Sequence, residues 1–144
     1  MGYHMTLQHI DCTILDPAGA LQALKSMPDK KYSWVGLKEV RACETLSGAL
    51  SVWRWEASHW PDDTVTVNDF TGEKYGDDLE MFQAIAPFVR PSSYIEMLGE
   101  DGAHWRWVFD GTTCKELNAA LVWCRQDALD YLANNPEEPC STAS

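Results

Sequence analysis

Apolar and polar residues alternate strictly after residue 93, which is the pattern of a strand with one buried face. Residues 94–98 and 104–109 both follow this pattern, and a glycine-rich turn sequence separates them. A three-residue loop over 100–102, with its final glycine in the left-handed conformation, would place Glu96 opposite Arg106. The sequence therefore predicts an antiparallel hairpin with this register.

The predicted register separates the side chains of the hairpin into an apolar face and a polar face. The apolar set is Ile95, Met97, Trp105, Trp107 and Phe109, and the polar set is Tyr94, Glu96, His104 and Arg106. Such a separation is typical of a sheet with one face on the core and one in water. A turn at Asp110–Gly111 then leads to a third strand, expected over 114–123, which completes a C-terminal three-stranded meander.

Helical spacing of apolar residues appears in three earlier segments. It predicts helices over 17–27, 46–57 and 78–86, the first beginning with a proline and the last ending before Pro87. The expected N-caps are Asp16, Thr45 and Asp77. Glu80 stands three residues after Asp77, which is the spacing of a capping box.

The remaining elements are shorter or less regular. Strands are expected over 3–15 and 64–70, a brief strand or irregular segment over 32–37, and a short helix over 127–132. This order predicts an α+β fold, in which a mainly antiparallel sheet has its helices packed on one face. A single domain over 1–133 with a flexible C-terminal tail over 134–144 is the expected organisation.

Composition narrows the classes of function. The chain has 144 residues, with 22 acidic and 11 basic side chains and a net charge of −11. This charge repels phosphate and counts against direct nucleic-acid binding, and no apolar run is long enough for a membrane span.

The N-terminal residues lack the pattern of a secretory signal, and the five cysteines show no paired spacing. A cytoplasmic protein with reduced thiols is therefore the expectation.

Motifs for cofactors and metals are missing from the sequence. The four histidines lie far apart and none has a second ligand at zinc spacing. There is no glycine-rich phosphate loop and no nucleophile elbow. We therefore expect no cofactor, no metal and no assembled catalytic set.

Acidic residues are concentrated in the middle of the chain. Residues 62–101 contain ten acidic and two basic side chains. Trp55 and Trp60 do not fall on an apolar stripe, so we expect them to be exposed contact residues. The predicted binding set is Trp55, Trp60, Asp62, Asp63, Asp77 and Asp78. This pattern favours a non-catalytic module that recognises a protein with a basic surface, while a solvated acidic surface that maintains solubility is the alternative.

The polar face of the hairpin suggests a second hypothesis. Tyr94, Glu96, His104 and Arg106 together could transfer a proton or bind an anion, as in a small enzyme or ligand-binding protein. The simpler interpretation is a cross-strand ion pair between Glu96 and Arg106 on a solvated sheet face. Formation of a homodimer through this sheet is a further hypothesis.

The hairpin sequence also carries a resemblance. Residues 93–97, 99–102 and 104–109, with the opening residues 1–6, resemble a group of uncharacterised small acidic proteins of gut bacteria and their mobile elements. The similarity covers most of residues 1–123. It implies an accessory role, such as that of an inhibitor, and it assigns no catalytic residue.

Overall fold

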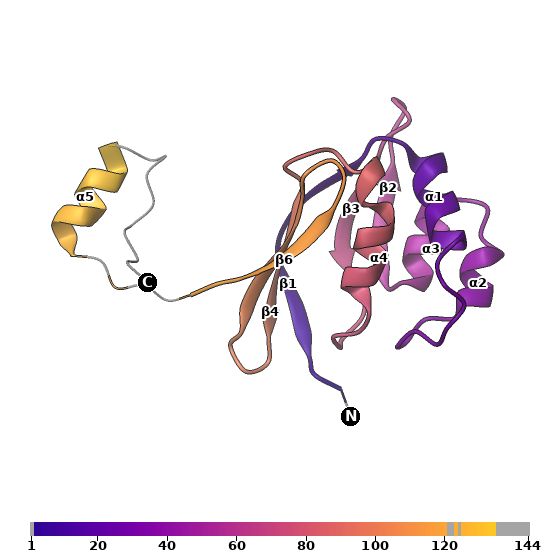
Figure 1. The fold of residues 1–144 in the computed structure, drawn as a ribbon, viewed down its shortest axis with the longest axis horizontal. Helices are drawn as coiled ribbons and strands as arrows, with labels where there is room; N and C mark the ends of the chain where they lie inside the picture. Colours follow the sequence, from indigo (N-terminus) through magenta and orange to yellow (C-terminus); the bar gives the residue numbers. More distant parts are fainter. Residues whose placement is uncertain (1, 121–122, 124, 135–144) are drawn as a thin grey trace.

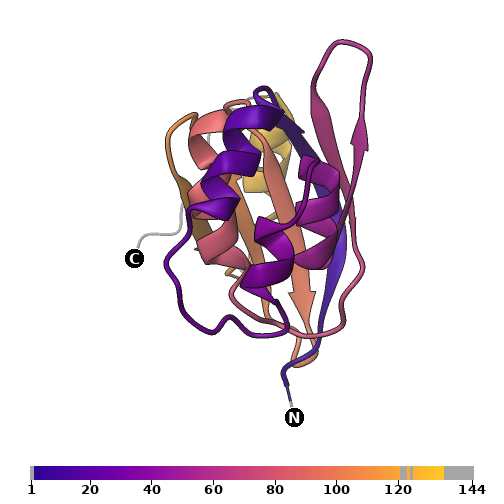
Figure 2. The ribbon, with the colours of Figure 1, turned by 90° about the vertical axis from the view of Figure 1, so that its right-hand side faces the viewer.

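The computed structural model describes residues 2–120, 123 and 125–134. It is an α+β structure with a six-stranded antiparallel sheet in the order β2-β3-β1-β4-β5-β6. The elements in chain order are β1 (Met5–Ile14), α1 (Pro17–Lys25), α2 (Leu37–Arg41), α3 (Leu46–Val52), β2 (Trp55–His59), β3 (Val65–Phe70), α4 (Asp78–Ile85), the 3-10 helix η1 (Ala86–Phe88), β4 (Tyr94–Gly99), β5 (His104–Phe109), β6 (Cys114–Asn118) and α5 (Gln126–Asn134). Helices α1 to α4 lie on the same face of the sheet (Figures 1 and 2), which confirms the predicted fold class.

The C-terminal meander has the predicted register. Glu96 pairs with Arg106, and β6 continues the sheet beyond β5. Gly102 has a φ of +87°, so the hairpin loop uses the left-handed conformation that favours glycine. Strand β6 ends at Asn118, earlier than the predicted limit of 123.

Two of the three predicted helix caps form. Asp16 and Thr45 each accept a hydrogen bond from a backbone N–H in the first turn of their helix, both at 3.1 Å. Asp77 stands at the N-cap position of α4 but forms no cap hydrogen bond. The predicted capping box is therefore wrong. The carboxylate of Asp77 accepts from the backbone of Ser33 instead, at 2.7 Å.

The predicted helix over 46–57 is too long. Helix α3 ends at Val52, and Arg54 then adopts a φ of +74°, which turns the chain into β2. Strand β2 and the short helix α2 were not predicted. Within 32–37, where a brief strand or irregular segment was expected, the structure has one isolated bridge between Tyr32 and Val35.

Aromatic side chains fill the space between the sheet and the helices. The Trp107 ring lies 5.3 Å from the Phe82 ring and 6.2 Å from the Trp55 ring, measured between centroids. Trp53, Trp105 and Trp107 are all buried, as the apolar pattern predicts. These contacts bury large apolar areas and connect α4 to the centre of the sheet.

After β6, the described residues contain one helix, α5 over Gln126–Asn134, which includes the predicted helix over 127–132. The predicted flexible tail over 134–144 lies outside the described residues, apart from Asn134. Among the residues that the structure describes, no helix is long and apolar enough to cross a membrane.

Candidate functional site

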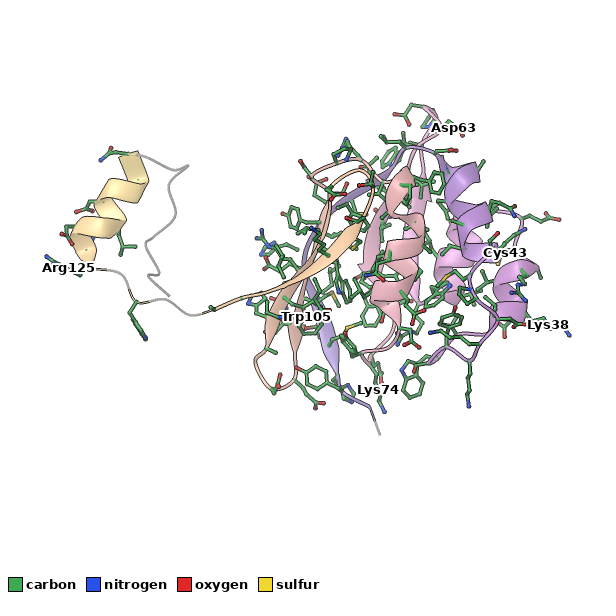
Figure 3. All side chains as sticks on the ribbon, viewed as in Figure 1. Lys38, Cys43, Asp63, Lys74, Trp105 and Arg125 are labelled. Atoms are coloured by element: carbon green, nitrogen blue, oxygen red, sulfur yellow. The ribbon has the colours of Figure 1, made fainter. Side chains whose placement is uncertain are left out.

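The loop between β2 and β3 carries three of the predicted binding residues, Trp60, Asp62 and Asp63. We call residues 59–64 the β2–β3 tip. Figure 2 shows this hairpin projecting beyond the helices, and Figure 3 places Asp63 at its outer end. The side chains of the three residues are exposed, and Trp60 keeps 52% of its surface in solvent.

Hydrogen bonds hold the β2–β3 tip in one conformation. The backbone N–H of Trp60 donates to Thr64 at 2.9 Å, and that of Asp63 donates to Trp60 at 3.0 Å. The carboxylate of Asp62 accepts from the hydroxyl of Thr64 at 2.6 Å and from its backbone N–H at 3.1 Å. These hydrogen bonds lower the pKa of Asp62, so this side chain stays charged.

The indole of Trp60 is also oriented by a hydrogen bond. Its Nε1–H donates to the hydroxyl of Thr66 on β3 at 2.8 Å, while the ring remains half exposed. The tip therefore presents an aromatic surface next to two carboxylates, Asp62 and Asp63. Little side-chain entropy remains to be lost when such a group enters a complementary pocket.

Trp55 and Asp78 are not surface residues, which corrects two of the predicted binding positions. Both are buried, Trp55 as the first residue of β2 and Asp78 as the first residue of α4. The Asp78 carboxylate accepts from Trp55 Nε1 at 2.9 Å and forms an ion pair with Arg54 at 3.0 Å. Burial raises the pKa of Asp78, and the hydrogen bond from Trp55 and the charge of Arg54 oppose this effect. These residues stabilise the fold and cannot contact a partner directly.

The acidic residues of the middle segment do not form one face. Asp62 and Asp63 lie in the β2–β3 tip, whereas Asp77 comes three residues after Lys74 and is partly buried. Figure 3 shows Asp63 at the top and Lys74 at the bottom of the sheet, beyond the two ends of β3. The predicted binding set therefore separates into three groups. Trp60, Asp62 and Asp63 are exposed in the β2–β3 tip, Trp55 and Asp78 form a buried pair, and Asp77 lies at the far end of the sheet.

The polar residues of the meander do come together. They lie on the face of the sheet that α1 to α4 leave uncovered, which we call the open face. Glu96 Oε1 accepts from Arg106 Nε at 2.6 Å, and Glu96 Oε2 lies 3.1 Å from His104 Nε2. The guanidinium of Arg106 also lies 4.8 Å from the ring centroid of Tyr94. Sequence analysis thus placed all four residues correctly on one face.

The chemistry of the open-face cluster is dominated by Glu96. Its side chain is only 12% exposed, and His9 approaches Oε2 to 4.0 Å from β1. The hydrogen bond from Arg106 lowers the pKa of Glu96. A carboxylate whose two oxygens both have partners, and whose pKa is lowered, is a weak general base. The cluster is therefore better suited to fixing strand register than to proton transfer.

Several cavities adjoin charged residues, and two of them are candidate binding sites. One, of about 270 Å³, lies beside the open-face cluster and is lined by Glu96, His104, Trp105, Arg106, Leu117, Asn118 and Ala119. The other, of about 310 Å³, is lined by Trp34, Arg54, Gly72, Glu73 and Lys74. Sequence analysis missed the second cavity because its walls come from three separate segments. The described part of the chain has no group of three or more His, Cys, Asp or Glu side chains that could hold a metal ion.

Comparisons of the chain with family models, curated proteins and solved structures found no match.

Proposed function

We propose that this protein is a non-catalytic binding module that recognises a partner protein through the β2–β3 tip. The observation that carries the proposal is the half-exposed indole of Trp60, which is held by a hydrogen bond in a tip with two carboxylates. Exposed tryptophans that are fixed in position are frequent energetic centres of protein interfaces. The complementary surface is an apolar pocket flanked by Lys or Arg side chains.

Charge supports this choice of partner. The net charge of −11 attracts a basic surface and accelerates encounter, while Asp62 and Asp63 supply charge next to the anchor. A cytoplasmic partner that itself binds nucleic acid has such a surface. Occupation of that surface by this acidic protein would inhibit the partner, which is the accessory or inhibitory role that we propose.

The test uses affinity capture with the full chain immobilised. A specific partner from a lysate of the source cells should bind the wild type, be lost with Trp60→Ala, and elute as salt is raised from about 0.05 to 0.5 M. The double variant D62N/D63N should weaken binding mainly by slowing association. Asparagine retains an acceptor oxygen, so the hydrogen bonds from Thr64 can persist in this variant.

Trp34→Ala is the matched control, because Trp34 is 54% exposed but lies outside the β2–β3 tip. It should retain the partner. Equal capture by the wild type and Trp60→Ala would refute the assignment of the tip. Partner binding that does not change with salt would refute the assignment of a basic partner.

A further inference from the structure

The cavity at the Lys74 end of the molecule has a wall formed by an exposed indole. Trp34 is 54% exposed and has a φ of +67°, a conformation that is costly for a residue with a large side chain. Its Nε1–H donates to the backbone of Tyr75 at 3.4 Å. Strained residues of this kind persist where the surrounding structure holds them, and they are concentrated at ligand sites.

A second strained residue, Arg54, forms another wall. Its φ is +74°, and its guanidinium donates to the backbone of Lys74 at 2.7 Å and to Asp78 at 3.0 Å. The guanidinium also lies 5.2 Å from the ring centroid of Phe70. Arg54 Nε is buried and has no hydrogen-bond partner among the described residues. The charge of Arg54 is thus balanced by Asp78, while its Nε–H has no hydrogen-bond acceptor among the described residues.

Two glycines allow these walls to approach each other. A Cβ at Gly72 would lie 3.0 Å from Arg54 Nη1, and a Cβ at Gly76 would lie 2.8 Å from Arg54 Nη2 and 3.0 Å from Trp34 Cδ1. All three separations are shorter than ordinary van der Waals contacts. The arrangement of Trp34 beside Arg54 therefore depends on having no side chain at positions 72 and 76.

Lys74 brings a positive charge to the lining of this cavity. Its ammonium lies 5.6 Å from the centroid of the Trp34 ring and forms no salt bridge with any residue that the structure describes. Because Asp78 already balances Arg54, the ammonium of Lys74 is the remaining positive charge in the lining, which also contains the carboxylate of Glu73. A ligand that contacts both the indole and the ammonium must combine a flat apolar ring with an anion.

We propose that this cavity binds a small aromatic carboxylate. The ring of the ligand packs against the indole of Trp34, and its carboxylate pairs with the ammonium of Lys74. The volume of about 310 Å³ accommodates one or two fused rings. For a ligand of about a dozen heavy atoms, this predicts a dissociation constant on the order of 0.1–1 mM.

The test compares two probes with the same ring and opposite charge, indole-3-acetate and tryptamine. Binding is followed by the indole N–H resonances of ¹⁵N-labelled protein, with the resonance of Trp34 assigned from its loss in Trp34→Phe. Indole-3-acetate should shift this resonance with saturation, and tryptamine should bind about tenfold more weakly or not at all. Lys74→Met, which leaves the backbone contact to Arg54 in place, should weaken indole-3-acetate about fivefold.

Two variants serve as controls. Glu73→Gln removes a negative charge from the lining and should leave the affinity for indole-3-acetate equal or higher. Trp60→Ala removes an equally exposed indole from the β2–β3 tip and should leave the affinity unchanged. Because this variant is expected to abolish partner capture, failure of the proposed function and failure of the ligand site are distinguishable.

Several results would overturn the proposal. One is tighter binding of tryptamine together with its loss in Glu73→Gln, which would indicate a cation site. Another is an unchanged affinity for indole-3-acetate in Lys74→Met. A third is the absence of any shift of the Trp34 resonance at about 10 mM of either probe, in protein whose dispersed spectrum shows that it is folded.

Discussion

Replacement of Asp78 by alanine should destabilise the protein strongly, although the residue belongs to the acidic segment of the chain. The Asp78 carboxylate is buried and accepts three hydrogen bonds: from Trp55 Nε1 at 2.9 Å, from Arg54 Nη2 at 3.0 Å and from the backbone of Gly76 at 3.2 Å. Alanine leaves all three donors without this acceptor. It also leaves the mostly buried guanidinium of Arg54 without its counter-charge.

The expected cost follows from these losses. A buried donor left without a partner costs about 1–3 kcal/mol, and removal of one member of a buried ion pair costs about 3–5 kcal/mol in total. The indole N–H of Trp55 cannot turn towards water, because the ring packs 4.8 Å from Phe70 and 5.1 Å from Phe82 between centroids. We therefore expect Asp78→Ala to lose about 3–5 kcal/mol of the free energy of unfolding.

The assay is urea denaturation at neutral pH, followed by tryptophan fluorescence. With a slope of about 2 kcal/mol per molar, the midpoint of Asp78→Ala should fall by roughly 1.5–2.5 M. Asp78→Asn retains one acceptor oxygen and should lose less. Asp29→Ala is the control, because the side chain of Asp29 is 86% exposed and its ion pair with Arg41 is long, at 3.8 Å; its midpoint should hardly change. Equal midpoints for Asp78→Ala and Asp29→Ala would refute the reasoning.

Two further predictions concern acid and thiol chemistry. Because Arg106 lowers the pKa of Glu96 in the folded state, the stability that Glu96 provides is fully present above about pH 4.3 and is lost progressively as the pH falls below this value; urea titrations should show a larger deficit of Glu96→Gln at about pH 7 than at about pH 3. Burial raises the pKa of Cys114 to about 12 and that of Cys12 further, so iodoacetamide should modify neither thiol at about pH 8 until urea unfolds the protein. Mass spectrometry of the peptides checks this, and rapid labelling of Cys12 in the folded protein would contradict it.

The hairpin and its polar cluster could be predicted because their determinants are local. A two-residue period around a short loop fixes which side chains face each other, so Glu96 was placed opposite Arg106 from a segment of 16 residues, 94–109. The same reasoning separated the buried tryptophans from the polar face. Neither inference required the position of a residue outside this segment.

The local region around Trp55 could not be predicted in this way. The apolar spacing that indicates α3 continues to Trp53, and nothing in the sequence shows that Arg54 adopts a positive φ, since glycine or asparagine is the usual residue there. That single conformation ends the helix and places Trp55 on a strand. The burial of Asp78 in turn depends on Arg54, which is 24 positions away along the chain.

The prediction that the acidic residues of the middle segment form one binding surface was wrong for a related reason. A concentration of charge along the chain says little about where each carboxylate lies when the segment contains three elements, β3, α4 and β4, that each cross the molecule. Between Asp63 and Asp77 the chain runs the length of β3 and reaches the opposite end of the sheet (Figure 3). Trp34, which lines the proposed ligand cavity with residues from two later segments, gave no signal in the sequence for the same reason.

The position of β1 in the middle of the sheet has a consequence for biosynthesis. Its neighbours are β3 and β4, and the buried hydrogen bond from Thr13 to Ser93 joins residues 80 positions apart. During translation the first strand emerges from the ribosome long before either neighbour exists. Half of the sheet cannot close until β4 has left the exit tunnel, and the nascent chain meanwhile exposes edges on which it can aggregate. Because these pairings are distant in sequence, we expect folding to be slow and chaperones that hold the N-terminal segment to raise the yield.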